Sequence, residues 1–388
     1  MKHLFERAQG SDKAVLVHIG IGRTPLREDT EEIVRLAETA GALCVGMVTG
    51  KRDKQDAALF AGSGKVAEIK TIKESEDADL IIFNHALSGA QERNLERELS
   101  CRVIDRVSLI LDIFAQRAQS AEGKLQVELA QLQHISTRLV RGWTHLDRQR
   151  GGGIGMRGPG ETQLETDRRL LGKRISQLQS RLEKVQKQHH TQRRARLHSG
   201  IANVAIVGYT NAGKSSLFNV LTKSGAYAAD QLFATLDTTV RKVYVPEARP
   251  MVLSDTVGFI RDLPHQLVTA FRATLTEAMQ ADLLLHVVDA ASPERDAQID
   301  AVNLVLREIG ADSIPQILLM NKIDCTDYPA QIHRDENQKI TTIYVSAQQK
   351  LGLELIRQAL QEFFPKVAYE SPSNETTLSD QYSDQQAV

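Results

Sequence analysis

The segment that most constrains this chain is a glycine-rich loop, Gly208-Tyr-Thr-Asn-Ala-Gly-Lys-Ser215. An apolar stretch, residues 204–207, precedes it, and a stretch with helical character, residues 216–221, follows it. A G-x-x-x-x-G-K-S loop between a strand and a helix is a P-loop, whose backbone N–H groups and helix N-terminus surround phosphates. The sequence therefore predicts a nucleotide-binding α/β domain. Lys214 is expected to reach the β- and γ-phosphates and Ser215 to bind Mg²⁺.

Two further motifs favour guanine over adenine. Asp255-Thr-Val-Gly258 is a D-x-x-G sequence, in which the carboxylate holds Mg²⁺ through water and the glycine N–H senses the γ-phosphate. Asn321-Lys-Ile-Asp324 is an N-K-x-D sequence, whose carboxylate accepts hydrogen bonds from guanine N1 and N2. Adenine would leave that carboxylate unpaired, at a high cost in free energy. Ser346-Ala347 resembles the element whose backbone contacts guanine O6. The order of the motifs predicts GTP as the substrate and GDP as the product.

A threonine between residues 216 and 250 should sense the γ-phosphate. Phe233-Ala-Thr-Leu-Asp237 has the F-x-T-L pattern of Obg-like GTPases, which favours Thr235, while Thr238 and Thr239 stay open as alternatives. Ras-like proteins carry a water-orienting glutamine directly after D-x-x-G, but here that residue is Phe259. We therefore expect slow hydrolysis by the protein alone and stimulation by a partner.

These motifs define one predicted site. Lys214, Thr235 and Gly258 are expected to act on the γ-phosphate, and Ser215 and Thr235 to ligate Mg²⁺, with Asp255 acting through water. The predicted nucleotide-binding residues are Gly208, Tyr209, Thr210, Asn211, Ala212, Gly213, Lys214, Ser215, Ser216, Phe233, Ala234, Thr235, Leu236, Asp237, Asp255, Thr256, Val257, Gly258, Asn321, Lys322, Ile323, Asp324, Val345, Ser346 and Ala347.

Charge is distributed unevenly along the chain. The whole sequence has 48 basic and 49 acidic residues, yet residues 121–200 contain sixteen Lys or Arg and seven Asp or Glu, a net charge of +9. A basic block of this size predicts contact with nucleic acid or an anionic surface. Leucines recur at helical spacing on both sides of residues 148–160, which contain six glycines and a proline and cannot continue a helix. We therefore predict an antiparallel helical hairpin with a glycine-rich loop. The two apolar stripes are Leu125, Leu129, Leu132 and Leu139, and Leu164, Leu171, Ile175, Leu178, Leu182 and Val185.

The N-terminal part alternates apolar runs with helical patterns. Runs at 14–19, 42–48, 80–83 and 102–104 are separated by helical stretches at 30–39, 65–73 and 91–99, which predicts a parallel α/β sheet. The predicted domains are an N-terminal α/β domain (1–118), the basic hairpin (119–198) and a P-loop GTPase domain (199–366). The last is expected to have a mixed, mostly parallel sheet with helices on both faces. The polar tail, 367–388, is expected to be disordered.

Composition points to a cytoplasmic protein. No apolar run approaches the roughly 20 residues needed to span a bilayer, so no membrane span is predicted, and weak membrane association stays open. The N-terminus has no apolar stretch typical of a secretory signal. Cys44, Cys101 and Cys325 lie far apart, as in a protein of a reducing compartment. We expect a monomer.

The glycine-rich segment and the residues after it resemble a known family. Gly151-Gly-Gly-Ile-Gly-Met-Arg-Gly-Pro-Gly-Glu-Thr-Gln-Leu-Glu-Thr-Asp-Arg-Arg169 is similar to the linker of the HflX GTPases of the Obg–HflX group. Residues 281–289, 105–117 and 62–65 also fit that family, and the resemblance covers about residues 10–365. It implies a GTPase that binds the large ribosomal subunit, directs this loop toward the peptidyl-transferase region, and separates stalled ribosomes into subunits under stress.

The resemblance also implies contacts with rRNA, since arginines pair with phosphates and stack on bases. Three alternatives stay open: an assembly factor for the large subunit, a nucleotide-gated RNA-binding module, and an RNA remodelling enzyme with an ATP site in the N-terminal domain. Gly62-Ser-Gly-Lys65 is the candidate for that second site. The predicted rRNA contacts are Arg148, Arg150, Gly151, Gly152, Gly153, Met156, Arg157 and Gly158.

Overall fold

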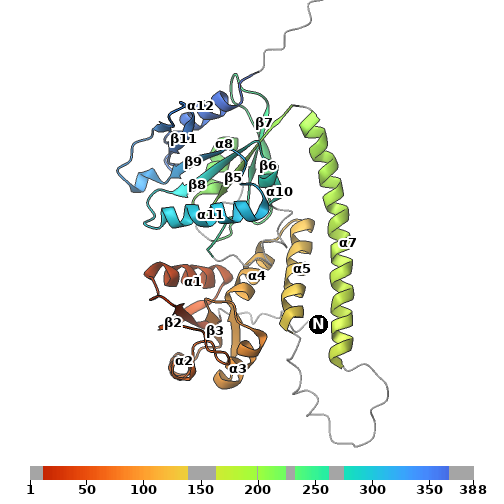
Figure 1. Ribbon diagram of the computed structural model, residues 1–388, viewed down its shortest axis with the longest axis vertical. Helices are drawn as coiled ribbons and strands as arrows, with labels where there is room; N and C mark the ends of the chain where they lie inside the picture. The colour runs from red at the N-terminus through yellow and green to blue at the C-terminus, as the bar shows by residue number, and fades with distance from the viewer. Residues whose placement is uncertain (1–11, 139–162, 199, 224–231, 262–274, 367–388) are drawn as a thin grey trace, which may run out of the picture.

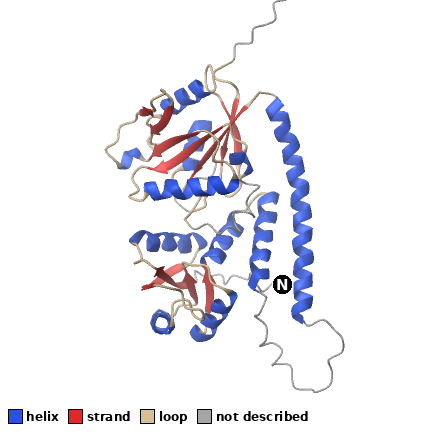
Figure 2. Cartoon of the chain, in the orientation of Figure 1, coloured by secondary structure: helices blue, strands red, loops and turns tan. Residues whose placement is uncertain are grey.

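The computed structural model describes residues 12–138, 163–198, 200–223, 232–261 and 275–366. These residues form two β-sheets that lie one above the other, with a pair of long helices beside them (Figure 1, Figure 2). The elements are β1 (Lys13–Ile21), α1 (Arg27–Ala40), β2 (Leu43–Arg52), α2 (Ser63–Glu76), β3 (Leu80–Phe83), α3 (Gly89–Leu99), β4 (Arg102–Asp105), α4 (Arg106–Arg117), α5 (Ala121–Arg138), α7 (Gln163–His198), β5 (Ala202–Gly208), α8 (Lys214–Thr222), β6 (Thr239–Val243), β7 (Met251–Asp255), α10 (Thr276–Met279), β8 (Leu283–Asp289), α11 (Arg295–Ile309), β9 (Gln316–Asn321), a 3₁₀ turn (Ile323–Cys325), β10 (Ile332–Arg334), β11 (Ile340–Tyr344) and α12 (Leu353–Phe363).

The first sheet has the order β2-β1-β3-β4 and is parallel throughout. All four apolar runs of the N-terminal part form its strands, which confirms the predicted α/β architecture. Side chains of β1 alternate between two apolar clusters: Val15 and Val17 share one with α2 and α3, and Leu16 shares the other with α1 and α4. The pairing of β1 with β2 continues beyond the apolar runs, as far as Ile21 and Arg52.

The second sheet has the order β10-β11-β9-β8-β5-β7-β6. Its central strands are parallel, while β6 and β10 at the two edges pair antiparallel with β7 and β11. Buried side chains of α8 and α12 pack on one face, and those of α10 and α11 on the other. This is the predicted mixed sheet with helices on both faces, as found in P-loop GTPases.

One buried apolar cluster runs from the α1 and α4 face of the first sheet to the α10 and α11 face of the second. At its centre the rings of Phe114 and Phe233 meet edge to face, with centroids 4.8 Å apart. Helix α4 therefore belongs to the packing of both sheets, just before the domain boundary predicted at residue 118. Buried residues on both sides of that boundary belong to this one apolar cluster.

Helices α5 and α7 pack against each other and run antiparallel (Figure 1). Leu129, Leu178 and Leu182 form the buried centre of their contact, flanked by partly buried leucines and an isoleucine from the predicted stripes. Arg174 adds two hydrogen bonds, of 2.9 and 2.6 Å, to one carboxylate oxygen of Glu128. The helical pairing is thus confirmed. The side chains of Leu139 and Leu164, the predicted loop with all its rRNA contacts, and the tail after 366 lie outside the described residues.

Among the described helices, none combines the length and apolar character that crossing a membrane requires. The three cysteines are unpaired, Cys44 and Cys101 being partly buried and Cys325 exposed.

The helical pairing gives a first prediction. Leu178→Ala removes a side chain that is 0% exposed between α5 and α7, so we expect the free energy of unfolding to fall by about 2–5 kcal/mol, as for other buried leucines. Leu170→Ala, on the same helix but 46% exposed, should change it by less than about 0.5 kcal/mol. Urea denaturation followed by circular dichroism measures both. Equal effects of the two substitutions would contradict the packing.

Candidate nucleotide-binding site

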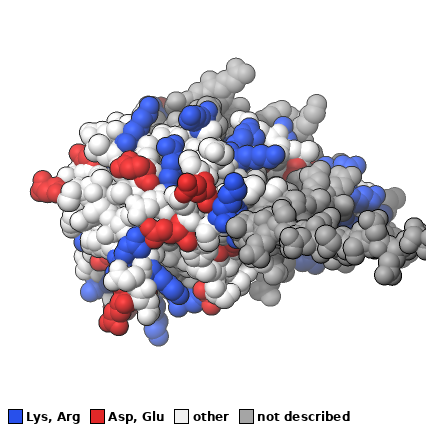
Figure 3. All heavy atoms as spheres, turned by 90° about the horizontal axis from the view of Figure 1, so that it is seen from above, with Lys and Arg blue, Asp and Glu red and all other residues white. Residues whose placement is uncertain are grey.

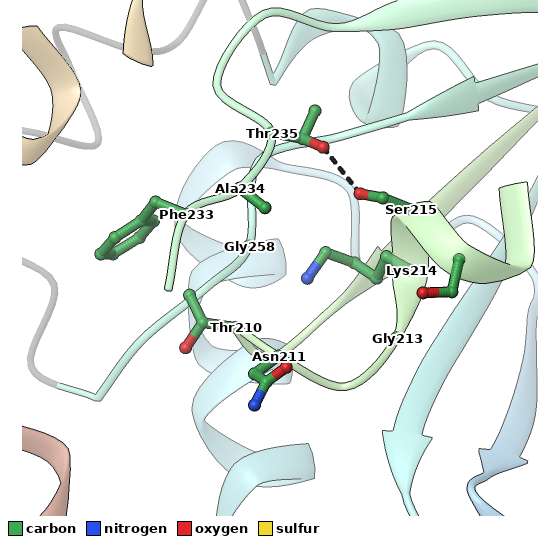
Figure 4. Close-up of a pocket in the computed structure, with 10 residues that line it drawn as sticks. Thr210, Asn211, Gly213, Lys214, Ser215, Phe233, Ala234, Thr235 and Gly258 are labelled. Atoms are coloured by element: carbon green, nitrogen blue, oxygen red, sulfur yellow. Dashed lines mark hydrogen bonds between the residues drawn. The ribbon is translucent and has the colours of Figure 1, made fainter. Parts of the chain in front are cut away.

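The glycine-rich loop joins the carboxyl end of β5 to the first turn of α8, and its glycines stand where a side chain cannot fit. A Cβ on Gly208 would lie 2.2 Å from the carbonyl oxygen of Val287. Gly213 has φ +93°, and a Cβ there would lie 2.2 Å from Nδ2 of Asn321. The loop therefore closes tightly over β8 and β9 and leaves a pocket in front of α8 (Figure 4). The pocket is lined by Thr210, Asn211, Gly213, Lys214, Ser215, Ser216, Phe233, Ala234, Thr235 and Gly258.

Lys214 carries the positive charge of this pocket. Its side chain is buried, and its ammonium donates a hydrogen bond of 2.7 Å to the carbonyl of Tyr209. Burial lowers its pKa to about 8, against an opposing effect of the Asp255 charge. Gly258 lies opposite, where a Cβ would come within 2.9 Å of the Lys214 Nζ. A phosphate entering between them would stabilise the charged form of the lysine and would meet the backbone of Gly258.

Two hydroxyls and a carboxylate converge beside the lysine. Ser215 Oγ lies 2.7 Å from Thr235 Oγ1 and donates to Asp255 Oδ2 at 2.7 Å, while Thr235 Oγ1 donates to the same oxygen at 2.9 Å. Figure 4 shows the first of these bonds at the edge of the pocket. Burial raises the pKa of Asp255, and the two hydroxyls and Lys214 oppose the shift.

This oxygen cluster fits a divalent cation. The second carboxylate oxygen of Asp255, Oδ1, is buried and has no hydrogen-bond partner among the described residues. Hydroxyl and carboxylate oxygens, completed by phosphate and water, are the ligands that Mg²⁺ prefers. Thr235 reaches this cluster, whereas Thr239, one of its alternatives, is the first residue of β6. In the described part of the chain, His, Cys, Asp and Glu form no group of three or more that could hold a metal, so the hydroxyls are essential to such a site.

The base-selective motif lies at the end of β9. The Asn321 amide donates to the carbonyl of Ala212 at 2.9 Å, and its oxygen accepts from the N–H of Ala347 at 3.0 Å. It therefore ties the P-loop to the Ser346–Ala347 loop. Oδ1 of Asp324 is shielded from solvent and has no hydrogen-bond partner among the described residues. An unpaired carboxylate oxygen at this position can accept hydrogen bonds from a base with adjacent N–H donors.

Several predicted nucleotide-binding residues have side chains that face the core instead. Their positions along the motifs are as predicted, but burial leaves only the backbone of each to face a ligand. The motifs in the sequence located these segments, but they did not indicate which side chains face the core and which face the pocket. These side chains belong to Phe233, Leu236, Val257, Ile323 and Val345.

Two polar members of the predicted set also face away. Thr256 donates its hydroxyl to the carbonyl of Ile206 at 2.7 Å, which joins β7 to β5. The Asp237 carboxylate accepts hydrogen bonds from the N–H groups of Gln119 and Ser120, at 2.8 and 2.7 Å. Both oxygens of the Asp237 side chain are engaged at the start of α5, so the backbone is the part of this residue that is left to face a nucleotide.

The backbone of Phe259 forms two hydrogen bonds with the P-loop. Its N–H donates to the carbonyl of Gly208 at 3.1 Å, and its carbonyl accepts from the N–H of Thr210 at 2.7 Å. The ring is 1% exposed and lies in the apolar cluster that joins the two sheets. The position that carries glutamine in Ras-like proteins is thus part of the core.

Sequence reasoning missed a polar network that connects the P-loop to the N-terminal sheet. The Tyr209 hydroxyl donates to Glu32 of α1 and accepts from the N–H of Arg261 at 2.8 Å. Arg106 of α4 donates to Glu32 at 2.6 Å and to the carbonyl of Arg261 at 2.9 Å. Burial and the charge of Glu32 raise the pKa of Tyr209, so its hydroxyl stays protonated. A cavity of about 410 Å³ lies beside this network, between α1 and the P-loop. Tyr209 lies in the P-loop motif, but no pattern in the sequence indicates that it meets Glu32, Arg106 and Arg261.

The second phosphate-binding candidate, Gly62-Ser-Gly-Lys65, lies at the start of α2. Lys65 donates to Glu68 of the same helix at 2.7 Å. The Arg52 guanidinium donates to the carbonyl of Ala61 at 3.1 Å and occupies the space that a Cβ on Gly62 would need. The cationic groups nearest this turn are therefore bound within the protein.

Comparison with known proteins places the chain among GTPases. It matches the families described as GTP-binding GTPase N-terminal over residues 27–115, GTP-binding GTPase Middle Region over 117–196, and 50S ribosome-binding GTPase over 203–322. It is 55% identical to the GTPase HflX of Escherichia coli (strain K12) over 360 residues, which cover 92% of this chain and 84% of that protein. It is 48% identical to the GTPase HflX of Caldanaerobacter subterraneus over 357 residues, 92% of this chain and 81% of that protein. The solved complex of SsGBP with GDP aligns with a TM-score of 0.50 at 25% identity, over 91% of this chain and 98% of that one.

The unpaired oxygen of Asp324 generates a second prediction. Asp324→Asn should weaken GTP binding roughly a hundredfold, because two hydrogen bonds to a charged acceptor, worth about 1.5 kcal/mol or more each, are lost. Xanthosine nucleotides, which present an acceptor where guanine has its amino group, should bind better to the variant than to the wild type. Fluorescent-nucleotide titration measures both affinities. Asp327→Asn, an exposed neighbour, serves as the control, and unchanged GTP affinity in Asp324→Asn would contradict the assignment.

Proposed function

Because the chain belongs to the HflX family of GTPases, we propose that it works on the ribosome: it binds the large ribosomal subunit and separates stalled or stress-inactivated ribosomes into subunits. The observation that carries this proposal is a nucleotide pocket whose Thr235 segment contacts, through Asp237, the start of the first helix of a basic helical hairpin. The 50S ribosome-binding GTPase family matched by residues 203–322 supports the choice of partner. The site of action is the cytoplasm, and the working unit is a monomer.

In this proposal the pocket holds GTP with Mg²⁺. Lys214 contacts the β- and γ-phosphates, and the N–H of Gly258 contacts the γ-phosphate. Ser215 and Thr235 ligate the cation, and Asp255, whose Oδ1 has no partner among the described residues, holds its water. The cation supplies charge neutralisation for the phosphates. Asp324 and the Ser346–Ala347 backbone select guanine. Hydrolysis yields GDP and phosphate, and this changes the contacts that hold Thr235.

The rRNA interface of this proposal lies on the hairpin. Among the side chains of α7 that the structure describes, six basic ones are exposed, and so is the acidic side chain of Glu183. By contrast, acidic and basic residues are interspersed over the face of the molecule seen in Figure 3. Basic residues on one long helix can follow a phosphate backbone, with binding that weakens as salt rises. The exposed bases are Arg168, Arg169, Lys173, Arg181, Lys184 and Lys187.

A third prediction tests the hairpin loop. Replacing residues 151–160 by a Gly/Ser linker of equal length should leave GTP and GDP affinity within about twofold, since the described lining of the P-loop pocket comes from residues 210–258. Separation of ribosomes into subunits should be lost, because the proposed rRNA contacts are removed. Sucrose-gradient sedimentation with GTP, GDP or a non-hydrolysable analogue measures the separation. Splitting by this variant at the wild-type rate would refute the proposed role of the loop.

A fourth prediction concerns hydrolysis. With Phe259 buried in the core, the isolated protein lacks the water-orienting glutamine of Ras-like proteins, so we expect it to be slow. A stabilising group supplied by a partner accelerates other GTPases by about 10³–10⁵. Purified large subunits should therefore raise the rate of single-turnover GTP hydrolysis by at least roughly a few hundredfold.

Salt provides the control for this measurement. If the basic hairpin binds rRNA phosphates, the stimulation should weaken steeply as salt rises, while hydrolysis by the free protein should change little. Fast hydrolysis by the free protein, unaffected by large subunits, would show that the chain already contains the complete catalytic group.

A further inference from the structure

Three contacts of the segment that carries Thr235, residues 232–238, bear on its role, and one of them lies at the nucleotide pocket. We refer to this segment as switch I. The ring of Phe233 packs edge to face on Phe114 of α4. Thr235, two residues on, reaches Ser215 and Asp255 at the proposed cation site. Asp237, two residues further, reaches the start of α5. Switch I therefore bridges the pocket and the hairpin directly.

The third contact joins Asp237 to the residues that lead into α5, among them Ser120, whose hydroxyl caps the first turn of the helix. One oxygen of Asp237 accepts from the N–H groups of Gln119 and Ser120, at 2.8 and 2.7 Å, and the other accepts from the Ser120 hydroxyl at 2.6 Å. The Ser120 hydroxyl in turn accepts from the N–H of Gly123 at 2.8 Å. A helix N-terminus has free N–H groups and a positive dipole end, so a carboxylate stabilises it.

The lack of a side chain at Gly123 leaves room for the Asp237 carboxylate. Gly123 is buried in the first turn of α5, and a Cβ there would lie 2.1 Å from Oδ1 of Asp237. Glycine is otherwise unfavourable inside a helix, where alanine forms helix better. Its presence is explained by the close approach of Asp237.

The other end of α5 is anchored to the N-terminal sheet. Arg138, the last residue of the helix, forms ion pairs with Glu92 of α3 and, at 2.5 Å, with Asp105 at the end of β4. Helix α5 thus runs from switch I to the first sheet, and the glycine-rich segment follows it in the sequence. A displacement of α5 at one end would therefore shift its contacts at the other end.

We infer that Asp237 is a positioning residue that couples the nucleotide state to the hairpin: it makes the docking of Thr235 at the cation site and the seating of α5 a single event. GTP, through its γ-phosphate and cation, favours the docked switch I and so the capped α5. GDP releases both. The inference rests on the nucleotide site proposed above. Coupling of this kind is reciprocal, so a partner that holds α5 in place raises the preference for GTP over GDP.

The test compares hydrogen exchange in the full chain bound to Mg²⁺ with GDP or with a non-hydrolysable GTP analogue. In the wild type, amides of residues 119–124 should exchange at least about fivefold more slowly with the analogue than with GDP, a ratio within the usual range of allosteric coupling. Titration of the same samples gives the preference for the analogue over GDP.

Two variants break the contact from opposite sides. Asp237→Asn turns an amide toward the donors of residues 119 and 120, and Gly123→Ala displaces the carboxylate by a substitution outside the nucleotide domain. Both should remove the nucleotide dependence of exchange at 119–124 and lower the preference for the analogue by about fivefold or more, with GDP affinity kept.

Matched controls use the same substitutions elsewhere. Asp282→Asn changes a carboxylate that accepts the N–H of Asn203 within the nucleotide domain. Gly172→Ala changes a glycine of α7 that has open space around it. Both should behave as the wild type.

Each result decides the inference. It is supported if both variants lose the nucleotide dependence while both controls keep it. Equal loss of protection in both nucleotides, with the preference for the analogue unchanged, would show that Asp237 only caps α5. Wild-type protein that binds both nucleotides without a difference at 119–124 would overturn the coupling but keep the site. Failure to bind either nucleotide would overturn the site and the coupling together.

Discussion

The amide of Asn321 is the interaction on which the nucleotide pocket depends. It lies at the end of β9, donates to the P-loop at Ala212 and accepts from Ala347 after β11. The ends of three parallel strands are thereby fixed relative to one another, which explains why Gly213 must lack a side chain. Because backbone and amide groups supply this frame, Lys214 and Asp324 are left available for a ligand. The amide and backbone groups that hold these strand ends together are therefore uncharged, and the charged side chains of the pocket lie beside them.

A second, buried network determines how the nucleotide domain sits on the N-terminal sheet. Arg106 is almost fully buried, and its guanidinium is shared among Asn84, Glu32 and the carbonyl of Arg261. A buried charge is costly unless its partners are well placed, and removing one partner leaves the cost uncompensated. Such a network specifies one relative orientation of two sheets that apolar packing alone would hold less selectively. It also places α1 directly beside the P-loop residue Tyr209.

The sequence was sufficient for the architecture because its signals are local. Apolar runs bounded by helical patterns identified the strands of the first sheet, and leucine spacing identified α5 and α7. Within the site, the motifs identified which segments approach the pocket, and the hydroxyl of Thr235, the threonine that the F-x-T-L pattern favours, lies beside that of Ser215. What the sequence could not supply depends on contacts between distant segments. Asp237 lies more than a hundred residues from the start of α5 that it contacts, and no pattern at Arg106 or Glu32 indicates that their side chains meet.

Phe259 shows how these two levels combine. Its backbone bridges the P-loop at Gly208 and Thr210, and its ring fills the cluster shared by the two sheets. A glutamine there would place an amide in an apolar environment, where an unpaired polar group costs about 1–3 kcal/mol. The position used for catalysis in Ras-like proteins is thus committed to joining the nucleotide domain to the N-terminal sheet. A domain built in this way gains a packed connection to the N-terminal sheet in place of a built-in group for orienting water, which is why we propose that a partner supplies that group.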